Sequence, residues 1–100
     1  MMDLNKQISM AFKTGKVELG CKGATDAAKS GKARLIVIAS NCPEPHRSDI
    51  LYNAGLSDLP VYTYSGTSAD LGAACERPFL VAALTVKEAG DSEILKLAEK

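Results

Sequence analysis

Three short segments carry the side chains in this chain that are best suited to binding chemistry. They are Gly20-Cys21-Lys22-Gly23, Ser40-Asn41-Cys42-Pro43 and Glu76-Arg77-Pro78-Phe79. Each joins residues with an unusually free or rigid backbone to one lysine, asparagine or arginine, and the third segment adds an aromatic ring. Lysine and arginine bind phosphates, an asparagine amide can read a base edge, and an aromatic ring can stack on an unpaired base. The pattern favours nucleic-acid contact if the fold brings the segments together.

Each segment also has an ordinary structural explanation. Gly20 to Gly23 can be a plain turn between a strand and a helix with an exposed lysine. Asn41 can begin a turn before Cys42-Pro43, because asparagine is common in turns. Phe79 can enter the core, which is the usual place for phenylalanine. The residues alone leave these alternatives open.

Residues for catalysis or metal binding are few. His46 is the only histidine, and no serine or cysteine nucleophile motif lies near it. The carboxylates are scattered, so none stands out as an acid–base pair. Cys21, Cys42 and Cys75 are odd in number and widely spaced, with no C-x-x-C pair, which leaves zinc and redox motifs unsupported. We expect a protein that is not an enzyme, with no metal and no cofactor, in a reducing compartment.

Strand and helix patterns alternate along the chain and place the three segments near strand ends. Strands are predicted for Val17–Leu19, Leu35–Ala39, Val61–Tyr64 and Phe79–Val86. Helices are predicted for residues 3–14, from the Gly20 segment to Gly31, for 45–57, from Thr67 to about Cys75, and after Gly90 with Ile94, Leu95 and Ala98 on its apolar face. Alternation is typical of an α/β/α sandwich with a largely parallel sheet, where ligands bind beyond the carboxyl ends of the strands.

Size and charge narrow the choice further. The chain has 100 residues, which predicts a single domain over residues 1–100. Twelve basic and twelve acidic residues give a formal net charge of zero. A protein that coats nucleic acid needs an excess of Lys and Arg, so we expect a compact site with few phosphate contacts. The longest apolar stretch, Phe79 to Leu84, is too short to cross a membrane, and we expect a cytoplasmic location.

The order of the segments adds a further indication. Gly20-x-Lys22 follows a strand, and Ala39-Ser40-Asn41-x-Pro43 follows a buried strand. Val61-Tyr62-x-Tyr64-x-Gly66-Thr67-Ser68-x-x-Leu71-Gly72 comes next, and then Arg77-Pro78-Phe79. In this order they make a chain that resembles the thirty-e family of large-subunit ribosomal proteins of archaea and eukaryotes. The resemblance covers almost the whole chain, and the length fits an archaeal-type member.

This resemblance implies a three-layer α/β/α sandwich with a four-stranded mixed sheet. It also implies a structural constituent of the large ribosomal subunit that binds ribosomal RNA at a kink-turn, a sharply bent internal loop, through three loops at one end of the sandwich. Asn41 would read bases at the sheared G·A pairs, Lys22 and Arg77 would hold the backbone, and Phe79 would pack on a base. Other implied partners are neighbouring ribosomal proteins, and the free protein would be a monomer.

Three alternatives stay open beside this interpretation. The chain could bind a kink-turn in a small ribonucleoprotein outside the ribosome, bind a small nucleotide through the Gly20 loop, or act as a protein–protein adaptor. Two features depart from the expected pattern. The net charge is neutral where a ribosomal protein is often basic, and Cys21 and Cys42 lie beside the candidate contacts without a physical reason to prefer a thiol there.

Overall fold

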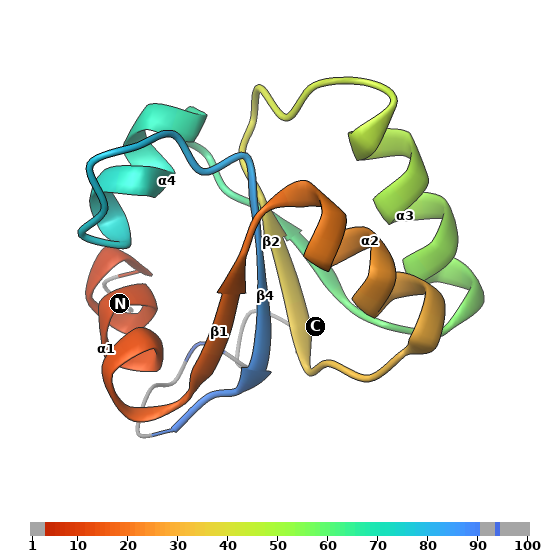
Figure 1. Ribbon diagram of the computed structural model, residues 1–100, viewed down its shortest axis with the longest axis horizontal. Coiled ribbons are helices and arrows are strands. Elements are labelled where there is room, and N and C mark those ends of the chain that lie inside the picture. The colour runs from red at the N-terminus through yellow and green to blue at the C-terminus, as the bar shows by residue number, and fades with distance from the viewer. Residues whose placement is uncertain (1–3, 91–93, 95–100) are drawn as a thin grey trace.

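The computed structural model describes residues 4–90 and 94 and contains one four-stranded sheet (Figure 1). The strands are β1 (Lys16–Leu19), β2 (Leu35–Ile38), β3 (Val61–Thr63) and β4 (Ala83–Glu88), in the order β1-β4-β2-β3. β4 runs antiparallel to both β1 and β2, whereas β2 and β3 are parallel. The mixed sheet implied by the family resemblance is confirmed. The largely parallel sheet predicted from alternation alone is wrong.

The antiparallel position of β4 follows from the short element before it. α4 (Ser68–Ala74) has only seven residues, and the segment after it returns to the end of the sheet where β3 stops. β4 therefore begins at that end and runs back between β1 and β2. As a result the carboxyl ends of β1, β2 and β3 and the start of β4 all lie at the upper end of the molecule in Figure 1.

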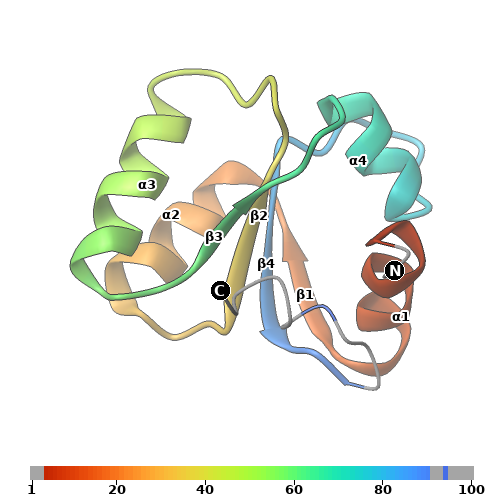
Figure 2. The same ribbon diagram turned by 180° about the vertical axis from the view of Figure 1, so that it is seen from behind.

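In the part of the chain that the structure describes, two helices cover each face of the sheet, which confirms the three layers (Figures 1 and 2). α2 (Cys21–Ser30) and α3 (His46–Leu56) lie on one face, and α1 (Leu4–Thr14) lies with α4 on the other. Alternate residues of a strand point to opposite faces, and β2 is buried on both. Leu35 and Val37 pack in the core beneath α1 and α4, whereas Ile36 and Ile38 pack beneath α2 and α3.

Helices α2 and α4 begin and end within a residue or two of the predicted positions, and local signals explain these ends. Ala24, Ala27 and Ala28 form the buried face of α2, so the helix can lie close to the sheet. Gly31 ends α2 in the left-handed conformation, and its N–H donates to the Ala27 carbonyl. Thr67 and Asp70 form a reciprocal capping box at the start of α4.

The predicted strand Phe79–Val86 is wrong at its beginning. β4 begins at Ala83, and the segment before it, which includes residues 79–82, runs past α4 before entering the sheet (Figure 1). The predicted last helix lies outside the described residues except for Ile94, which is buried in the core with α1. Within the described part of the chain, no helix is both long enough and apolar enough to cross a membrane.

Candidate nucleic-acid interface

Two backbone hydrogen bonds bring the three segments to the same end of the sheet. The Gly20 N–H donates to the Ala83 carbonyl at 2.9 Å, and the Ala39 N–H donates to the Ala82 carbonyl at 2.8 Å. The β1–α2 and β2–α3 connections therefore lie on either side of the start of β4. We call this region the loop end. It comprises residues 20–23, 40–43 and 78–82, at the top of Figure 1.

The first segment is a helix start instead of an extended loop. Gly20 has φ 111° and ψ 152°, a conformation that L side chains rarely adopt, and α2 begins at Cys21. Cys21, Lys22 and Gly23 form the first turn, which has no side-chain cap. The first N–H groups of a helix lack partners within the helix and carry partial positive charge. With the exposed Lys22 ammonium, this turn presents a positive surface at the loop end.

Asn41 is exposed, and the oxygen of its side-chain amide already accepts a hydrogen bond within the protein. Its Oδ1 accepts a hydrogen bond of 2.7 Å from the Ser68 N–H at the first turn of α4. The Nδ2 group has no hydrogen-bond partner among the described residues. The sequence predicts Asn41 as both donor and acceptor. In the structure its acceptor ties the second loop to α4, and its donors stay available on an exposed residue.

The neighbours of Asn41 shape the loop. Ser40 donates its backbone N–H and its Oγ to the Gly66 carbonyl, at 3.0 and 2.9 Å. The Cys42 side chain is buried in the core, and burial together with the adjacent Cys21 thiol raises its pKa to about 11. Pro43 is exposed. Ser40 and Cys42 therefore hold the loop in place, whereas Asn41 and Pro43 are accessible.

The third segment exposes two large apolar side chains at the loop end. Phe79 is 55% exposed and Leu80 is 69% exposed. Together with Gly20 and Cys21 they line a cavity of about 300 Å³ between the first and third segments. Leu80 was missed by the sequence reasoning. The only signal for it is an apolar residue directly after Pro78-Phe79, which also fits the interior of a strand.

Arg77 points to another part of the molecule. Its guanidinium lies over the Phe12 ring of α1, 5.1 Å from the ring centroid. The preceding Glu76 accepts a hydrogen bond of 2.6 Å from Ser9 Oγ and pairs with Lys13 at 3.4 Å, and these contacts lower the pKa of its carboxyl. The third segment is thus divided. Residues 76–77 lie against α1, and residues 78–80 lie at the loop end.

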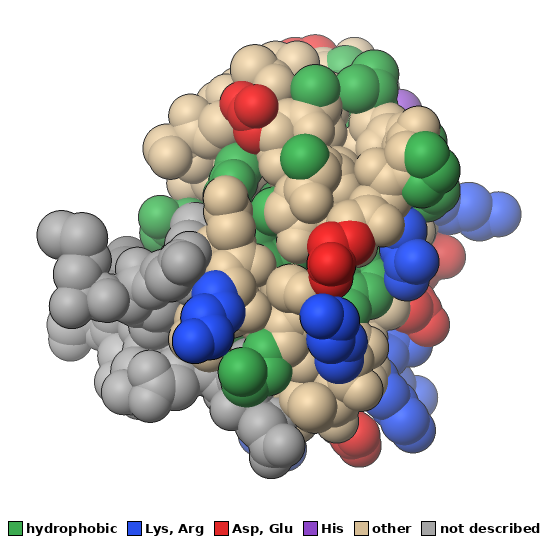
Figure 3. All heavy atoms as spheres, turned by 90° about the vertical axis from the view of Figure 1, so that its left-hand side faces the viewer, with side chains coloured by type: hydrophobic (Ala, Val, Ile, Leu, Met, Phe, Trp, Pro, Cys, Tyr) green, Lys and Arg blue, Asp and Glu red, His purple; other side chains and the backbone are tan. Residues whose placement is uncertain are grey.

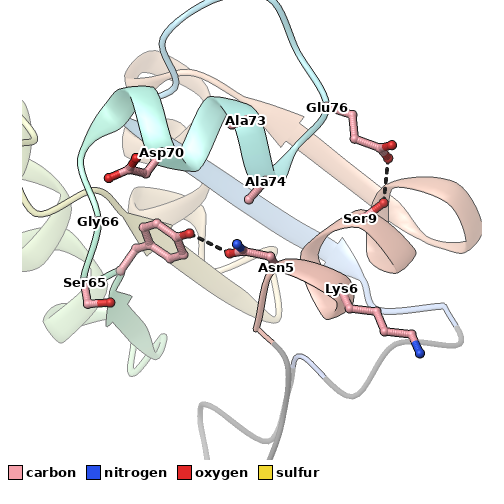
Figure 4. A pocket seen from close by; sticks show the side chains of 10 residues that line it. Asn5, Lys6, Ser9, Ser65, Gly66, Asp70, Ala73, Ala74 and Glu76 are labelled. Carbon is pink, nitrogen blue, oxygen red and sulfur yellow. Dashed lines mark hydrogen bonds between the residues drawn. The ribbon is translucent and has the colours of Figure 1, made fainter.

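A larger pocket lies between α1 and α4, but its charge has the wrong sign for phosphate. The Tyr64 hydroxyl donates to Asn5 Oδ1 at 2.6 Å, and Ser9 Oγ donates to Glu76. Figure 4 labels Asn5, Ser9 and Glu76 around this pocket. Among the described residues that line the pocket, the carboxylates of Asp70 and Glu76 outnumber the one lysine, Lys6. Among the described residues no three His, Cys, Asp or Glu side chains are placed to hold a metal ion. The positive and apolar groups at the loop end are therefore better suited to nucleic acid.

Comparison with known proteins identifies the family. The sequence profile of the ribosomal protein L7Ae/L30e/S12e/Gadd45 family matches residues 2–96. The chain belongs to this family. The large ribosomal subunit protein eL30 of Methanothermobacter thermautotrophicus is 48% identical over 96 residues, which are 96% of this chain and 98% of that protein. The eL30 protein of Methanopyrus kandleri is 43% identical over 100 residues, covering all of this chain and 92% of the relative.

A third relative agrees with this assignment, and a solved structure has the same fold. The eL30 protein of Methanocaldococcus jannaschii is 48% identical over 99 residues, covering 99% of this chain and 90% of that protein. A Bacillus halodurans protein of unknown function has the same fold, with a TM-score of 0.82 over the full length of both chains and 20% identity. Family membership therefore rests on the sequences, and the solved structure supports the α/β/α fold alone.

Proposed function

We propose that this protein is a non-enzymatic constituent of the large ribosomal subunit, in the cytoplasm, that binds a kink-turn or similar internal loop of ribosomal RNA through its loop end. Relatives at 43–48% identity are named as proteins of that subunit, and the alignments span 90–98% of their length. This agreement over whole chains supports the same role here.

The observation that carries the RNA-binding part is the combination of groups at the loop end. An uncapped helix start with Lys22 suits a phosphate. The free donors of Asn41 suit base acceptors such as N7 or O6 of a purine. The cavity beside Phe79 and Leu80 suits an unstacked base. A continuous RNA duplex offers no unstacked base, so this set favours a bent RNA with an internal loop.

The neutral net charge agrees with recognition at a small site. Non-specific binding to nucleic acid grows with the number of phosphates that Lys and Arg neutralise. With zero net charge, the protein depends on the local positive turn and on the shape of the RNA. In this proposal Lys22 holds backbone, Asn41 reads a base edge, Phe79 packs on a base, and Arg77 reaches backbone from its position against α1.

Neighbouring ribosomal proteins are proposed as further partners of a protein that is a monomer when free. α3 exposes Leu51, Tyr52 and Leu56 on the side of the molecule, apart from the loop end. We propose these side chains as the contact with a neighbouring protein.

Sedimentation of tagged protein in a cell extract tests the ribosomal role. We expect it to travel with large subunits at high salt. Travel only with small ribonucleoproteins would favour the non-ribosomal alternative.

NMR titration with a kink-turn RNA tests where the RNA binds. We expect the largest amide shift changes at residues 20–23, 41 and 78–81, with little change at the opposite end around Gly31 and Lys32. Changes centred on α3 would contradict the proposed site. The same titration with a free nucleotide serves as the control, and strong shifts at residues 20–23 with nucleotide alone would favour the nucleotide-binding alternative.

A further inference from the structure

A second concave surface lies on the flank of the molecule, between the end of α1, strand β1 and the segment after α4. Its cavity measures about 570 Å³, and Phe12 and Val17 form its apolar part. Three cationic side chains line it: Lys16, Arg77 and Lys87. We call it the flank groove. Figure 3 looks from the side of α1 and α4 and shows Lys and Arg mainly on the lower and right-hand parts of this face, with Asp and Glu among them.

The flank groove carries excess positive charge in a protein that has none overall. Glu18, the one carboxylate among the described residues that line the groove, pairs with Lys87 at 3.0 Å. Glu88 lies opposite Lys16 in the β1–β4 ladder, but no ion pair joins them. Within residues 4–90 and 94, neither Lys16 nor Arg77 forms an ion pair. Two cations are thus left to attract an anion into the groove.

Arg77 is held in a fixed position before any ligand arrives. Its guanidinium stacks on Phe12, and the adjacent Glu76 is anchored to Ser9 and Lys13 of α1. Stacking on a ring uses the face of the guanidinium and leaves its N–H edges available. Those edges form a planar fork that matches the two oxygens of a phosphate. The same fork also matches a carboxylate, so the groove is suited to an oxyanion with two oxygens more than to a simple halide.

The groove begins near the loop end at Arg77, which stands two residues before Phe79, and extends along the flank toward Lys16 and Lys87, at the opposite ends of β1 and β4 from the loop end. We infer that the flank groove binds the phosphate backbone of an RNA arm that leaves the loop end, with Lys16, Arg77 and Lys87 as the contacts. This inference rests on the proposed function, because an RNA held at the loop end is what places an arm beside the groove. It adds Lys16 and Lys87 to the residues proposed to contact RNA, so that they and Arg77 bind the RNA backbone together.

The test compares two RNAs across a series of salt concentrations. One is a minimal kink-turn, and the other is the same kink-turn with both duplex arms lengthened. We expect the wild type to bind the longer RNA more tightly and with a steeper salt dependence. The double variant Lys16→Ala/Arg77→Ala removes two cations from the groove. On the longer RNA, the slope of log K against log salt is expected to become shallower by about 0.7–0.9 for each phosphate that the variant no longer neutralises. On the minimal RNA, the change in slope is expected to be smaller.

A matched control removes the same charge elsewhere. Lys29→Ala/Lys32→Ala changes two exposed lysines at the far end of α2 and is expected to leave both slopes unchanged. Circular dichroism checks that both double variants are folded. Equal slopes for the wild type on the two RNAs, or equal effects of the two double variants, would overturn the flank groove.

A different result would show that the proposed function itself is wrong. In that case the protein would bind the minimal kink-turn and an unkinked duplex with equal affinity. In that case the groove is still judged on the longer RNA. A shallower slope for Lys16→Ala/Arg77→Ala, and not for the control pair, would support a phosphate site, whereas unchanged slopes would reject it.

Discussion

Asn41 shows how one side chain can serve the fold and the RNA together. Its Oδ1 accepts from the Ser68 N–H, so the loop is fixed to α4 and the amide donors stay available on an exposed side chain. A side chain that is ordered before binding loses less entropy when it meets its ligand. The residue that we propose as the base reader is thus also a structural tie between two loops.

Asn41→Asp separates these two roles. The carboxylate can still accept from Ser68, so the free energy of unfolding is expected to change by less than about 0.5 kcal/mol, as for most exposed substitutions. The donors are removed and a negative charge is added, so RNA binding is expected to weaken by at least about 1–3 kcal/mol. Asn41→Ala is expected to lose RNA affinity and also about 1 kcal/mol of stability, because the hydrogen bond to α4 is removed. Urea unfolding and gel-shift titration measure both quantities. Wild-type affinity in Asn41→Asp would remove Asn41 from the base-reading role.

Gly23 is a glycine that the free protein does not require. It lies inside the first turn of α2, and an added Cβ would meet only the Glu18 carboxylate at 3.6 Å. Gly23→Ala is therefore expected to stabilise the protein by up to about 1 kcal/mol, since alanine is the better helix former. If an RNA backbone approaches this turn closely, the same change weakens RNA binding. Thermal unfolding and RNA titration of one variant give both numbers, and unchanged RNA affinity would mean that the RNA keeps its distance from Gly23.

Sequence reasoning found the polar residues at the loop end more readily than their orientation. Lys22, Asn41 and Phe79 could be chosen from residue type and position after strands. The hydrogen bond from the Ser68 N–H to Asn41 Oδ1 joins residues 27 positions apart. The stacking of Arg77 on Phe12 joins residues 65 positions apart. Local sequence patterns do not predict contacts at such separations. Cys42 looked like part of the loop surface, but its side chain completes the core beneath it.

At the scale of elements, α4 and the segment after it control the third part of the loop end. Gly72 is buried in α4, and an added Cβ would stand 2.2 Å from the Phe79 carbonyl oxygen. The segment is held there by hydrogen bonds from Arg77 N–H to the Gly72 carbonyl and from Val81 N–H to the Ser68 carbonyl, both 3.0 Å. The absence of a side chain at position 72 is what lets Phe79 and Leu80 lie at the loop end.

Gly72→Ala is expected to push this segment away from α4. The overlap with a backbone atom is expected to cost about 1–3 kcal/mol of unfolding free energy, the usual range for overpacking, and to weaken RNA binding as Phe79 moves. Gly55→Ala is the control, because that glycine lies in α3 with open space around its Cβ position. The control is expected to gain stability and keep its RNA affinity. A Gly72→Ala protein as stable as the wild type would contradict the packing seen here.

The elements themselves could be predicted far better than their order in the sheet. The capping box at Thr67 and the glycine end of α2 are local signals, and both are present. The central place of β4 between β1 and β2 is not a local property, because it depends on how α4 redirects the chain. Pattern alone predicted a parallel sheet, and only the family resemblance predicted the mixed one.

At the scale of the whole molecule, the buried thiols link stability to alkaline pH. Burial raises the pKa of Cys42 and of Cys75 from 9.0 to about 11. The folded state therefore keeps these protons when the unfolded chain begins to lose them. The resulting stabilisation is complete below pH 9 and is lost as the pH rises from 9 to 11, by at most about 1.4 kcal/mol per pH unit for each thiol.

Cys42→Ala isolates this effect for one thiol. At pH 7 the wild type is expected to be the more stable protein, because the variant leaves unfilled space in the core. Above pH 9 the difference in unfolding free energy is expected to shrink steadily, because only the wild type still loses the Cys42 contribution. Urea unfolding at several pH values between 7 and 11, under reducing conditions, measures it. A constant difference over that range would mean that Cys42 ionises as readily in the folded protein as in the unfolded chain.

The neutral charge of the whole molecule makes specificity the central question. A protein with twelve basic and twelve acidic residues gains little from general attraction to RNA, so its binding must come from the loop end and the groups beside it. The most direct measurement is a gel-shift titration, at one fixed salt concentration, against a kink-turn RNA and the same RNA with its sheared G·A pairs replaced by Watson–Crick pairs. We expect binding to the kink-turn to be tighter by about tenfold or more, the difference that one or two good base contacts make. Equal and weak binding to both RNAs would contradict recognition of a bent RNA by this end of the sandwich.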